Sequence, residues 1–275
     1  MKRLTLLTNP DICNLHCPLC FLKQRGKPAG FGEMPIEVAL RAIEKYAGIK
    51  EVIPSTMGEP LLYSKFAELL ELCVSRGIPM NLTTNGSFPG KWGTDEGMKE
   101  LLLACSDIKV STLSYEMGGL TEEEWKESVE RLLESRRRLE QVEKYSSSVS
   151  LQVTLHRENV SRASGLLQWA EQVGISRIKW NPVVFLDCAS RELREQFALP
   201  EGAVERLRME LCSKKVRCEG SLFWGNRQGT CAVARIDCDG NAPECPFTDE
   251  VWVWPDGHED HCPNPVRRWS SSCYI

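Results

Sequence analysis

Three cysteines near the N-terminus have the spacing of a metal site. Residues 13–20 read CNLHCPLC, which places thiols at Cys13, Cys17 and Cys20. Three thiolates can hold three irons of a 4Fe-4S cluster and leave the fourth iron free to bind a substrate or a cofactor. Zinc is the alternative, with His16 or a distant residue as fourth ligand, but His16 is adjacent to Cys17 and would have difficulty reaching the same ion. The stretch therefore favours a reactive iron–sulfur site over a structural zinc site.

Composition limits the classes of protein that this chain can represent. Its 275 residues, 42% of them hydrophobic, suffice for one large α/β domain with a small appendage. No apolar run approaches the roughly 18 residues that span a membrane, and the apolar start is too short for a signal peptide, so we expect a cytoplasmic protein without a membrane partner. The net charge of -4 gives no field that favours nucleic acid. Thirteen cysteines in a reducing compartment indicate metal binding and not a disulfide framework.

Four of the cysteines stand apart from the others. Cys73 and Cys105 each lie near the end of an apolar helical pattern, FAELLELC and LLLAC. Free cysteine behaves as a small hydrophobic residue, so we interpret both as buried core residues. Cys188 and Cys212 receive the same interpretation.

Strand and helix patterns alternate along most of the chain. Strands are expected at residues 4–8, 51–55, 78–84, 107–114, 148–155 and 175–185, and helices at 35–47, 63–77, 97–104, 121–145, 164–174 and 200–212. This alternation requires right-handed crossovers and a parallel sheet. Six units are too few for a closed eightfold barrel, so we predict an α/β fold with a partial (β/α)6 TIM-like barrel over residues 1–215 and a small cysteine-rich extension over residues 216–275. Functional residues should lie on the loops at the carboxyl ends of the strands.

The cysteine motif follows the first predicted strand, and this position agrees with a known family. A C-x3-C-x2-C motif in that place resembles the signature of the radical S-adenosylmethionine (radical SAM) superfamily, and the resemblance covers about residues 4–215. It implies that the open iron chelates the amino and carboxylate groups of S-adenosylmethionine. It further implies that one electron cleaves this cofactor to methionine and a 5'-deoxyadenosyl radical, which removes a hydrogen atom from a substrate. A reductant such as flavodoxin or ferredoxin is the implied protein partner.

Two further loops are similar to the family's cofactor-binding motifs. MGEP at residues 57–60 resembles GGEP, in which Glu59 could accept a charged hydrogen bond from the methionine ammonium group. TTNG at residues 83–86 resembles the ribose-contacting loop. Ser111 and Ser114 could also face the cofactor, or could simply end the fourth strand. The resemblance thus implies cofactor contacts at Met57, Gly58, Glu59, Pro60, Thr83, Thr84, Asn85 and Ser111.

Some residues depart from the family's pattern. Leu19 stands where an aromatic residue usually precedes the third cysteine, and Met57 replaces the first glycine of GGEP. A clear glycine-isoleucine adenine motif is not found near the fifth strand. We expect the adenine pocket near residues 153–155 or near Trp180.

The tail carries a second cysteine pattern. Residues 245–262, CPFTDEVWVWPDGHEDHC, combine an alternating strand with a PDG turn and predict a hairpin that brings Cys245 and Cys262 together. The Cys-x11-Gly-x4-Cys spacing resembles the opening of the twitch or SPASM subdomain, which carries an auxiliary 4Fe-4S cluster. The further ligands implied are Cys273, with Cys231 or Cys238 as the fourth. The alternative is a zinc site in which His258 and His261 join Cys245 and Cys262.

Together these features predict a radical SAM enzyme that acts on a small molecule or a short peptide, assisted by an auxiliary cluster. Because no domain is visible before Leu4, we expect no leader-binding domain and therefore such substrates in preference to a longer chain. A maturase of a ribosomally made peptide or protein is an alternative, as is a non-catalytic zinc-binding or iron–sulfur electron-transfer protein. Trp224, Asn226, Arg227 and Gln228 could face the substrate or belong to a plain linker.

Overall fold

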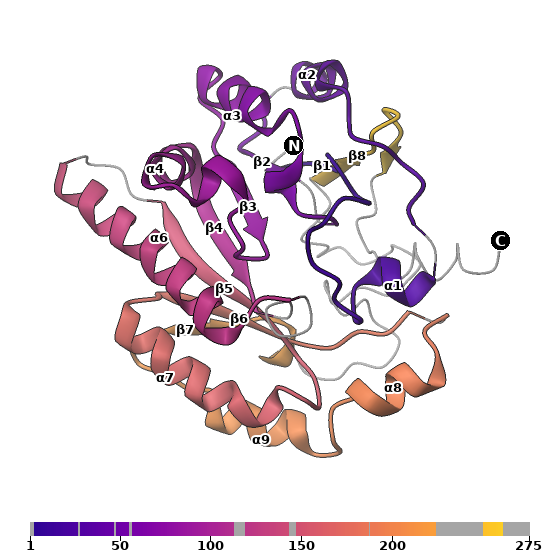
Figure 1. The fold of residues 1–275 in the computed structure, drawn as a ribbon, viewed down its shortest axis with the longest axis vertical. Coiled ribbons are helices and arrows are strands. Elements are labelled where there is room, and N and C mark those ends of the chain that lie inside the picture. Colours follow the sequence, from indigo (N-terminus) through magenta and orange to yellow (C-terminus); the bar gives the residue numbers. More distant parts are fainter. Residues whose placement is uncertain are drawn as a thin grey trace.

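One sheet of mainly parallel strands organises the chain (Figure 1). The computed structural model describes residues 3–26, 28–46, 48–54, 57–112, 119–142, 147–186, 188–223 and 250–260. Within these residues the strand order is β7-β6-β5-β4-β3-β2-β1-β8-β9, and only β9 runs antiparallel to its neighbour. The strands are β1 (Arg3–Leu6), β2 (Glu51–Pro54), β3 (Met80–Thr84), β4 (Cys105–Ser111), β5 (Ser148–Leu155), β6 (Arg177–Pro182), β7 (Arg217–Glu219), β8 (Glu250–Val253) and β9 (Glu259–Asp260).

Helices follow the strands and lie on the outer side of the sheet, as Figure 1 shows for α3, α4, α6 and α7. The α-helices are α1 (Phe21–Arg25), α2 (Ile36–Lys45), α3 (Phe66–Ser75), α4 (Asp95–Ala104), α6 (Glu122–Val142), α7 (Ala163–Val173), α8 (Arg191–Phe197) and α9 (Ala203–Glu210). The part of the chain that the structure describes also contains four short 3-10 helices: η1 (Pro60–Leu62), η2 (Gly90–Gly93), η3 (Val160–Arg162) and η4 (Ser221–Phe223). The predicted partial TIM-like barrel is confirmed.

A capping box starts α6. The hydroxyl of Thr121 accepts from the backbone N–H of Glu124 at 3.2 Å, and the Glu124 carboxylate accepts from the backbone N–H of Thr121 at 2.9 Å. Each side chain thus accepts from a backbone N–H group that would otherwise lack a hydrogen-bond partner at the start of the helix. Trp125, Val129 and Leu132 then bury one face of α6 against the sheet. Capping and apolar periodicity therefore agree on the position of this helix.

The two faces of the strands differ in chemistry. Leu4, Ile108 and Leu151 are fully buried and belong to the main core. Residues that alternate with such core positions are polar: Asp107 accepts from Ser150 and lies 3.1 Å from the ammonium of Lys109. Because side chains of a strand point alternately to its two faces, the apolar face meets the helices and the polar face lines the inside of the barrel.

Among the described residues, two parallel strands extend the sheet beyond the six strands of the predicted barrel, and one of them is the strand predicted in the tail. β7 pairs with β6, while β8 pairs with β1, with Arg3 opposite Glu250 and Leu6 opposite Val253. β7 has only three residues, which are too few to show a strand pattern in the sequence. The pairing of β8 with β1 joins segments at opposite ends of the chain, and a local sequence pattern does not indicate such a partner. The described part of the tail thus joins the same sheet as the first strand.

The predicted hairpin is present in the described part of the tail. β8 and β9 pair through Trp252 opposite Asp260, and the turn places Gly257 at φ +85°. Glu259 accepts from Tyr46 at 2.7 Å and pairs with Lys45 at 2.7 Å, which ties the hairpin to the end of α2.

No helix among the described residues combines the length and the hydropathy that a bilayer crossing requires.

Candidate functional site

Three loops that follow neighbouring strands meet at one edge of the sheet. The cysteine loop (residues 9–20) comes after β1, the MGEP loop (residues 57–60) after β2, and the TTNG loop (residues 83–86) at the end of β3. Because β1, β2 and β3 are parallel neighbours, their carboxyl ends lie side by side. The three motifs that the sequence singled out are therefore brought together.

The MGEP loop is packed directly on the cysteine loop. The backbone N–H of Glu59 donates to the Ile12 carbonyl at 2.8 Å, and the side-chain amide of Asn9 donates to the Glu59 carbonyl at 2.7 Å. Gly58 has φ +73°, and a Cβ at this position would clash with the backbone oxygen of Asn9 and lie 2.7 Å from that of Ile12. Only glycine fits both the backbone conformation and the close approach.

The carboxylate of Glu59 connects the MGEP loop with the TTNG loop. One oxygen accepts from the Thr84 hydroxyl at 2.8 Å and the other from the backbone N–H of Asn85 at 2.7 Å, while the backbone N–H of Leu61 donates at 3.2 Å. The residue is only 1% exposed. Burial raises the pKa of Glu59 to about 7, and these hydrogen bonds oppose that rise. A direct contact of Glu59 with a cofactor stays a prediction, whereas its role between the loops is observed.

Asn85 places the TTNG loop beside the first cysteine. Its side-chain nitrogen lies 3.8 Å from Cys13 Sγ and donates to Asn14 Oδ1 at 3.0 Å. Asn14 in turn donates to the Ser87 hydroxyl at 2.9 Å. Two sequence-predicted residues, Cys13 and Asn85, are thus brought into contact.

The three cysteines lie on the exposed rim of this arrangement. Cys13 is exposed, and Cys17 and Cys20 are half-buried. Desolvation raises the pKa of the Cys13 thiol, the N–H of Leu15 lowers it, and Glu59 and Cys20 are close enough to raise it further. The backbone N–H of Cys20 donates to the Cys17 carbonyl at 3.1 Å.

Two polar side chains, Asp11 before the three cysteines and Gln24 after them, anchor the cysteine loop to other backbone segments. The Asp11 carboxylate accepts from the backbone N–H groups of residues 29–31 at 2.5 to 3.1 Å. Gln24, buried in α1, donates to the Leu19 carbonyl at 2.8 Å and accepts from the backbone N–H of Leu186 at 2.8 Å. The backbone before and after the three cysteines is therefore fixed by the protein.

The three thiols of the cysteine loop are the donor type that an iron–sulfur cluster takes, with one thiolate to each iron. In the described part of the chain, no three histidine, cysteine, aspartate or glutamate side chains are grouped closely enough to hold one ion. Iron at Cys13, Cys17 and Cys20 stays a prediction.

The other predicted cofactor-binding residues lie around the same loops. Met57 is buried in a small apolar cluster with Leu7, Leu186, Trp252 and Trp254. Pro60 begins η1, Thr83 is half-buried at the end of β3, and half-buried Ser111 ends β4. Ser114 lies outside the described residues. Cofactor contacts of these residues stay predictions.

The structure confirms two of the interpretations of single cysteines and corrects two. Cys73 and Cys105 are fully buried in the main core, as predicted. Cys212 is exposed, because α9 ends at Glu210 and Leu211 takes the buried position. Cys188 is half-buried beside the small apolar cluster, with its Sγ 3.8 Å from the Gln24 carbonyl oxygen, so it is not a fully buried core residue.

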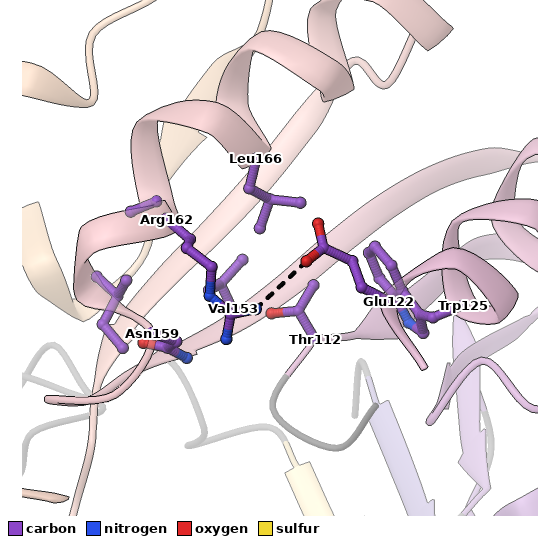
Figure 2. Close-up of a pocket in the computed structure, with 9 residues that line it drawn as sticks. Thr112, Glu122, Trp125, Val153, Asn159, Arg162 and Leu166 are labelled. Atoms are coloured by element: carbon purple, nitrogen blue, oxygen red, sulfur yellow. Dashed lines mark hydrogen bonds and ion pairs between the residues drawn. The ribbon is translucent and has the colours of Figure 1, made fainter. Parts of the chain in front are cut away.

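A small pocket opens beside the carboxyl ends of β4 and β5, on the side of the sheet that faces the helices (Figure 2). Figure 2 shows Arg162 and Glu122 pointing toward one another across it, with Thr112 nearby. The Arg162 guanidinium lies 3.3 Å from the Glu122 carboxylate. Val153 and Leu155 line it, and its volume of about 20 Å³ has room for a water molecule and not for a purine base. Trp180 is fully buried in the core. An adenine pocket near residues 153–155 or near Trp180 stays a prediction.

Several predicted residues lie outside the described part of the chain. They are Cys231, Cys238, Cys245, Cys262, Cys273, His261, Trp224, Asn226, Arg227 and Gln228.

Sequence reasoning missed residues that hold the loops together. Asn9 bridges the cysteine and MGEP loops, Asp11 fastens the segment after α1, and Asn14 contacts Asn85. The only local signal was the cluster of turn-forming residues in TNPD just before Cys13, which indicates a turn but not its partners.

Comparisons with known proteins agree with this geometry. A family model described as the radical SAM superfamily matches residues 10–160. The chain is 26% identical over 178 residues to the tungsten-containing aldehyde ferredoxin oxidoreductase cofactor-modifying protein of Pyrococcus furiosus, an alignment that covers 59% of this chain and 46% of that relative. The chain thus spans less than half the length of this curated relative.

Solved structures share the fold at low sequence identity. The structure of anSMEcpe with bound AdoMet has a TM-score of 0.67 at 15% identity and is covered over 72% of its length, by 96% of this chain. Streptococcus suis SuiB bound to the precursor peptide SuiA has a TM-score of 0.61 at 14% identity, with 96% of this chain and 60% of that chain covered.

Proposed function

The chain belongs to the radical SAM superfamily, and from this premise we propose that it is an enzyme that cleaves S-adenosylmethionine reductively and removes a hydrogen atom from a substrate. The observation that carries the proposal is the meeting of three loops through Glu59 and Asn85. This contact puts the three-cysteine loop beside both of the other motifs. The proposed function involves neither a membrane nor a nucleic acid as a partner.

Cys13, Cys17 and Cys20 would hold the 4Fe-4S cluster. When bound, the cluster supplies the electron that cleaves S-adenosylmethionine to methionine and a 5'-deoxyadenosyl radical. The chain's own part is to hold the thiols on an anchored loop and to present polar backbone beside them. A flavodoxin or ferredoxin would deliver the electron.

The MGEP and TTNG loops would bind S-adenosylmethionine, together with Ser111. Gly58 allows the MGEP backbone to approach the cysteine loop, and we assign the backbone of this loop to the methionine part of the cofactor. The hydrogen bonds of Glu59 go to protein groups, and its contribution would be to keep the two loops together. Thr83 and Asn85 are the polar side chains of the TTNG loop that we assign to the ribose side.

An auxiliary 4Fe-4S cluster in the tail is the second part of the proposal. We assign residues 1–215 to the radical SAM core and residues 216–275 to a twitch-like or SPASM-like region. Its ligands would be Cys245, Cys262 and Cys273, with Cys231 or Cys238. The support is the hairpin of β8 and β9, because Cys245 precedes it by a few residues and Cys262 follows it closely in sequence.

We propose a small molecule or a short peptide as the substrate. The Pyrococcus relative is named a cofactor-modifying protein, which supports a small-molecule substrate. Solved structures with this fold include SuiB with a precursor peptide and anSMEcpe with a peptide, which supports a peptide substrate. The second of these observations favours an alternative substrate, a ribosomally made peptide or protein that this chain would mature.

Anaerobic assay of reconstituted protein tests the proposal. Reduction in the presence of S-adenosylmethionine should yield 5'-deoxyadenosine even without substrate, and the variant with Cys13, Cys17 and Cys20 changed to Ala should yield none. A colourless protein would indicate a zinc module. A brown protein that leaves S-adenosylmethionine intact would indicate an electron carrier.

A further inference from the structure

Asn85 contacts the first cysteine in a geometry that its neighbours dictate. The backbone N–H of Asn85 donates to Glu59 Oε2 at 2.7 Å, which fixes the backbone of the residue. Its side-chain oxygen accepts from the backbone N–H of Ser87 at 2.9 Å. A backbone N–H can only donate, so the amide cannot be turned the other way. The side-chain nitrogen must therefore face the cysteine loop.

The two hydrogens of this nitrogen have two acceptors. One is Asn14 Oδ1 at 3.0 Å, and the other is Cys13 Sγ at 3.8 Å. The backbone N–H of Leu15 is a second donor to the same sulfur, at 3.4 Å. Asn85 is 8% exposed, so water competes little for its amide. A thiolate at Cys13 would strengthen both contacts, because a charged acceptor makes a stronger hydrogen bond.

We propose that Asn85 is a positioning residue for Cys13: its amide orients this sulfur and raises the reduction potential of the cluster that the sulfur holds. Hydrogen bonds to the sulfurs are among the factors that set the potential of an iron–sulfur cluster. The reduced cluster carries more negative charge, so a donor beside its sulfur stabilises the reduced state. The inference rests on the proposed function, since it requires iron at Cys13, and it adds a role for Asn85 that does not depend on contact with S-adenosylmethionine.

Redox titration followed by electron paramagnetic resonance tests this role in the full-length, reconstituted protein. The signal of the first cluster is identified as the one that changes when S-adenosylmethionine is added. Asn85→Leu removes both N–H donors, and Asn85→Asp keeps the size and the acceptor for Ser87 but adds a negative charge. Both should shift the midpoint potential to more negative values, Asn85→Asp further than Asn85→Leu.

Ser87→Ala is the matched control. It removes the hydroxyl that accepts from Asn14 at 2.9 Å but keeps the backbone N–H that holds the Asn85 oxygen, so the potential should stay where it is in the unmodified protein. The inference is overturned if iron-loaded Asn85→Asp and Asn85→Leu keep the unmodified potential, or if Ser87→Ala shifts it equally. Absence of a signal that responds to S-adenosylmethionine in the unmodified protein would instead overturn the proposed function, and this inference with it.

Discussion

The carboxylate of Glu59 accepts a hydrogen bond from the backbone N–H of Asn85 at 2.7 Å, which joins loops that follow neighbouring strands β2 and β3. The backbone of Glu59 also binds the cysteine loop through Ile12. One buried residue therefore holds the three loops of the site in a common arrangement. Changes at Glu59 should affect the whole site and not a single contact.

Replacement of Glu59 with Ala should lower both stability and cofactor affinity. The change leaves the Thr84 hydroxyl and the backbone N–H groups of Asn85 and Leu61 without their acceptor, and each buried group without a partner costs about 1–3 kcal/mol. We expect the free energy of unfolding in urea to fall by at least about 2 kcal/mol, and S-adenosylmethionine affinity, measured by calorimetry, to fall with it. Unchanged affinity would show that the MGEP loop does not form the cofactor site.

Stability should depend on pH through the same carboxyl group. The pKa of Glu59 is about 7 in the folded chain, against 4.5 for an ordinary glutamate, so the folded state holds this proton more tightly. The contribution of this group to the free energy of unfolding should therefore be fully present below pH 4.5 and be lost as pH rises through 7, in total about 3 kcal/mol, of which about 1 kcal/mol falls between pH 6 and pH 8. Anaerobic urea unfolding of the unmodified protein and of Glu59→Gln should show a smaller decrease in the variant, which cannot titrate at this position. Equal pH slopes would contradict the raised pKa.

Gly58 offers a test of the packing between loops. Gly58→Ala forces a residue with a Cβ to a positive φ, at about 1–2 kcal/mol, and the clash with the Asn9 and Ile12 backbone adds about 1–3 kcal/mol. Gly30→Ala is the control, because Gly30 has φ +86° but nothing within 4 Å of the added carbon. Gly58→Ala should lose more stability in urea unfolding and bind less iron per chain than Gly30→Ala. Equal losses would mean that the close approach is unimportant.

Local patterns predicted most of the barrel and left its long-range contacts open. Alternation of apolar residues identified the six strands β1 to β6, because each strand carries its own pattern. The pairing of β8 with β1 joins Arg3 to Glu250, and no local pattern encodes a partner so distant in sequence. For the same reason Asn9 and Asp11, which act through contacts with remote backbone, were not identified as parts of the site.

The motifs of the site were predictable, but their geometry was not. MGEP and TTNG follow the expected strands, since turn residues after a strand are visible in sequence. That Glu59 faces Thr84 and Asn85 depends on side-chain direction in a folded loop. Cys212 shows the same limit, since a helix that ends at Glu210 instead of reaching Cys212 moves this thiol from the core to the surface.

Iron content tests the auxiliary cluster in the tail. If both cysteine groups hold 4Fe-4S clusters, the reconstituted protein should contain about eight irons per chain, and the variant with Cys13, Cys17 and Cys20 changed to Ala should keep about four. That variant should no longer cleave S-adenosylmethionine, because only the first cluster has an open iron.

The complementary variant changes the two cysteines that flank the hairpin in sequence. Changing Cys245 and Cys262 to Ala should leave about four irons and allow some 5'-deoxyadenosine formation while substrate turnover is impaired. Cys73→Ala is the matched control for the loss of a thiol, since Cys73 is buried in the core and its replacement should leave the iron content of folded protein unchanged. Zinc in place of iron in the variant that lacks Cys13, Cys17 and Cys20, or iron close to zero there, would contradict a second cluster and leave the tail as a zinc-binding or thiol-rich cap.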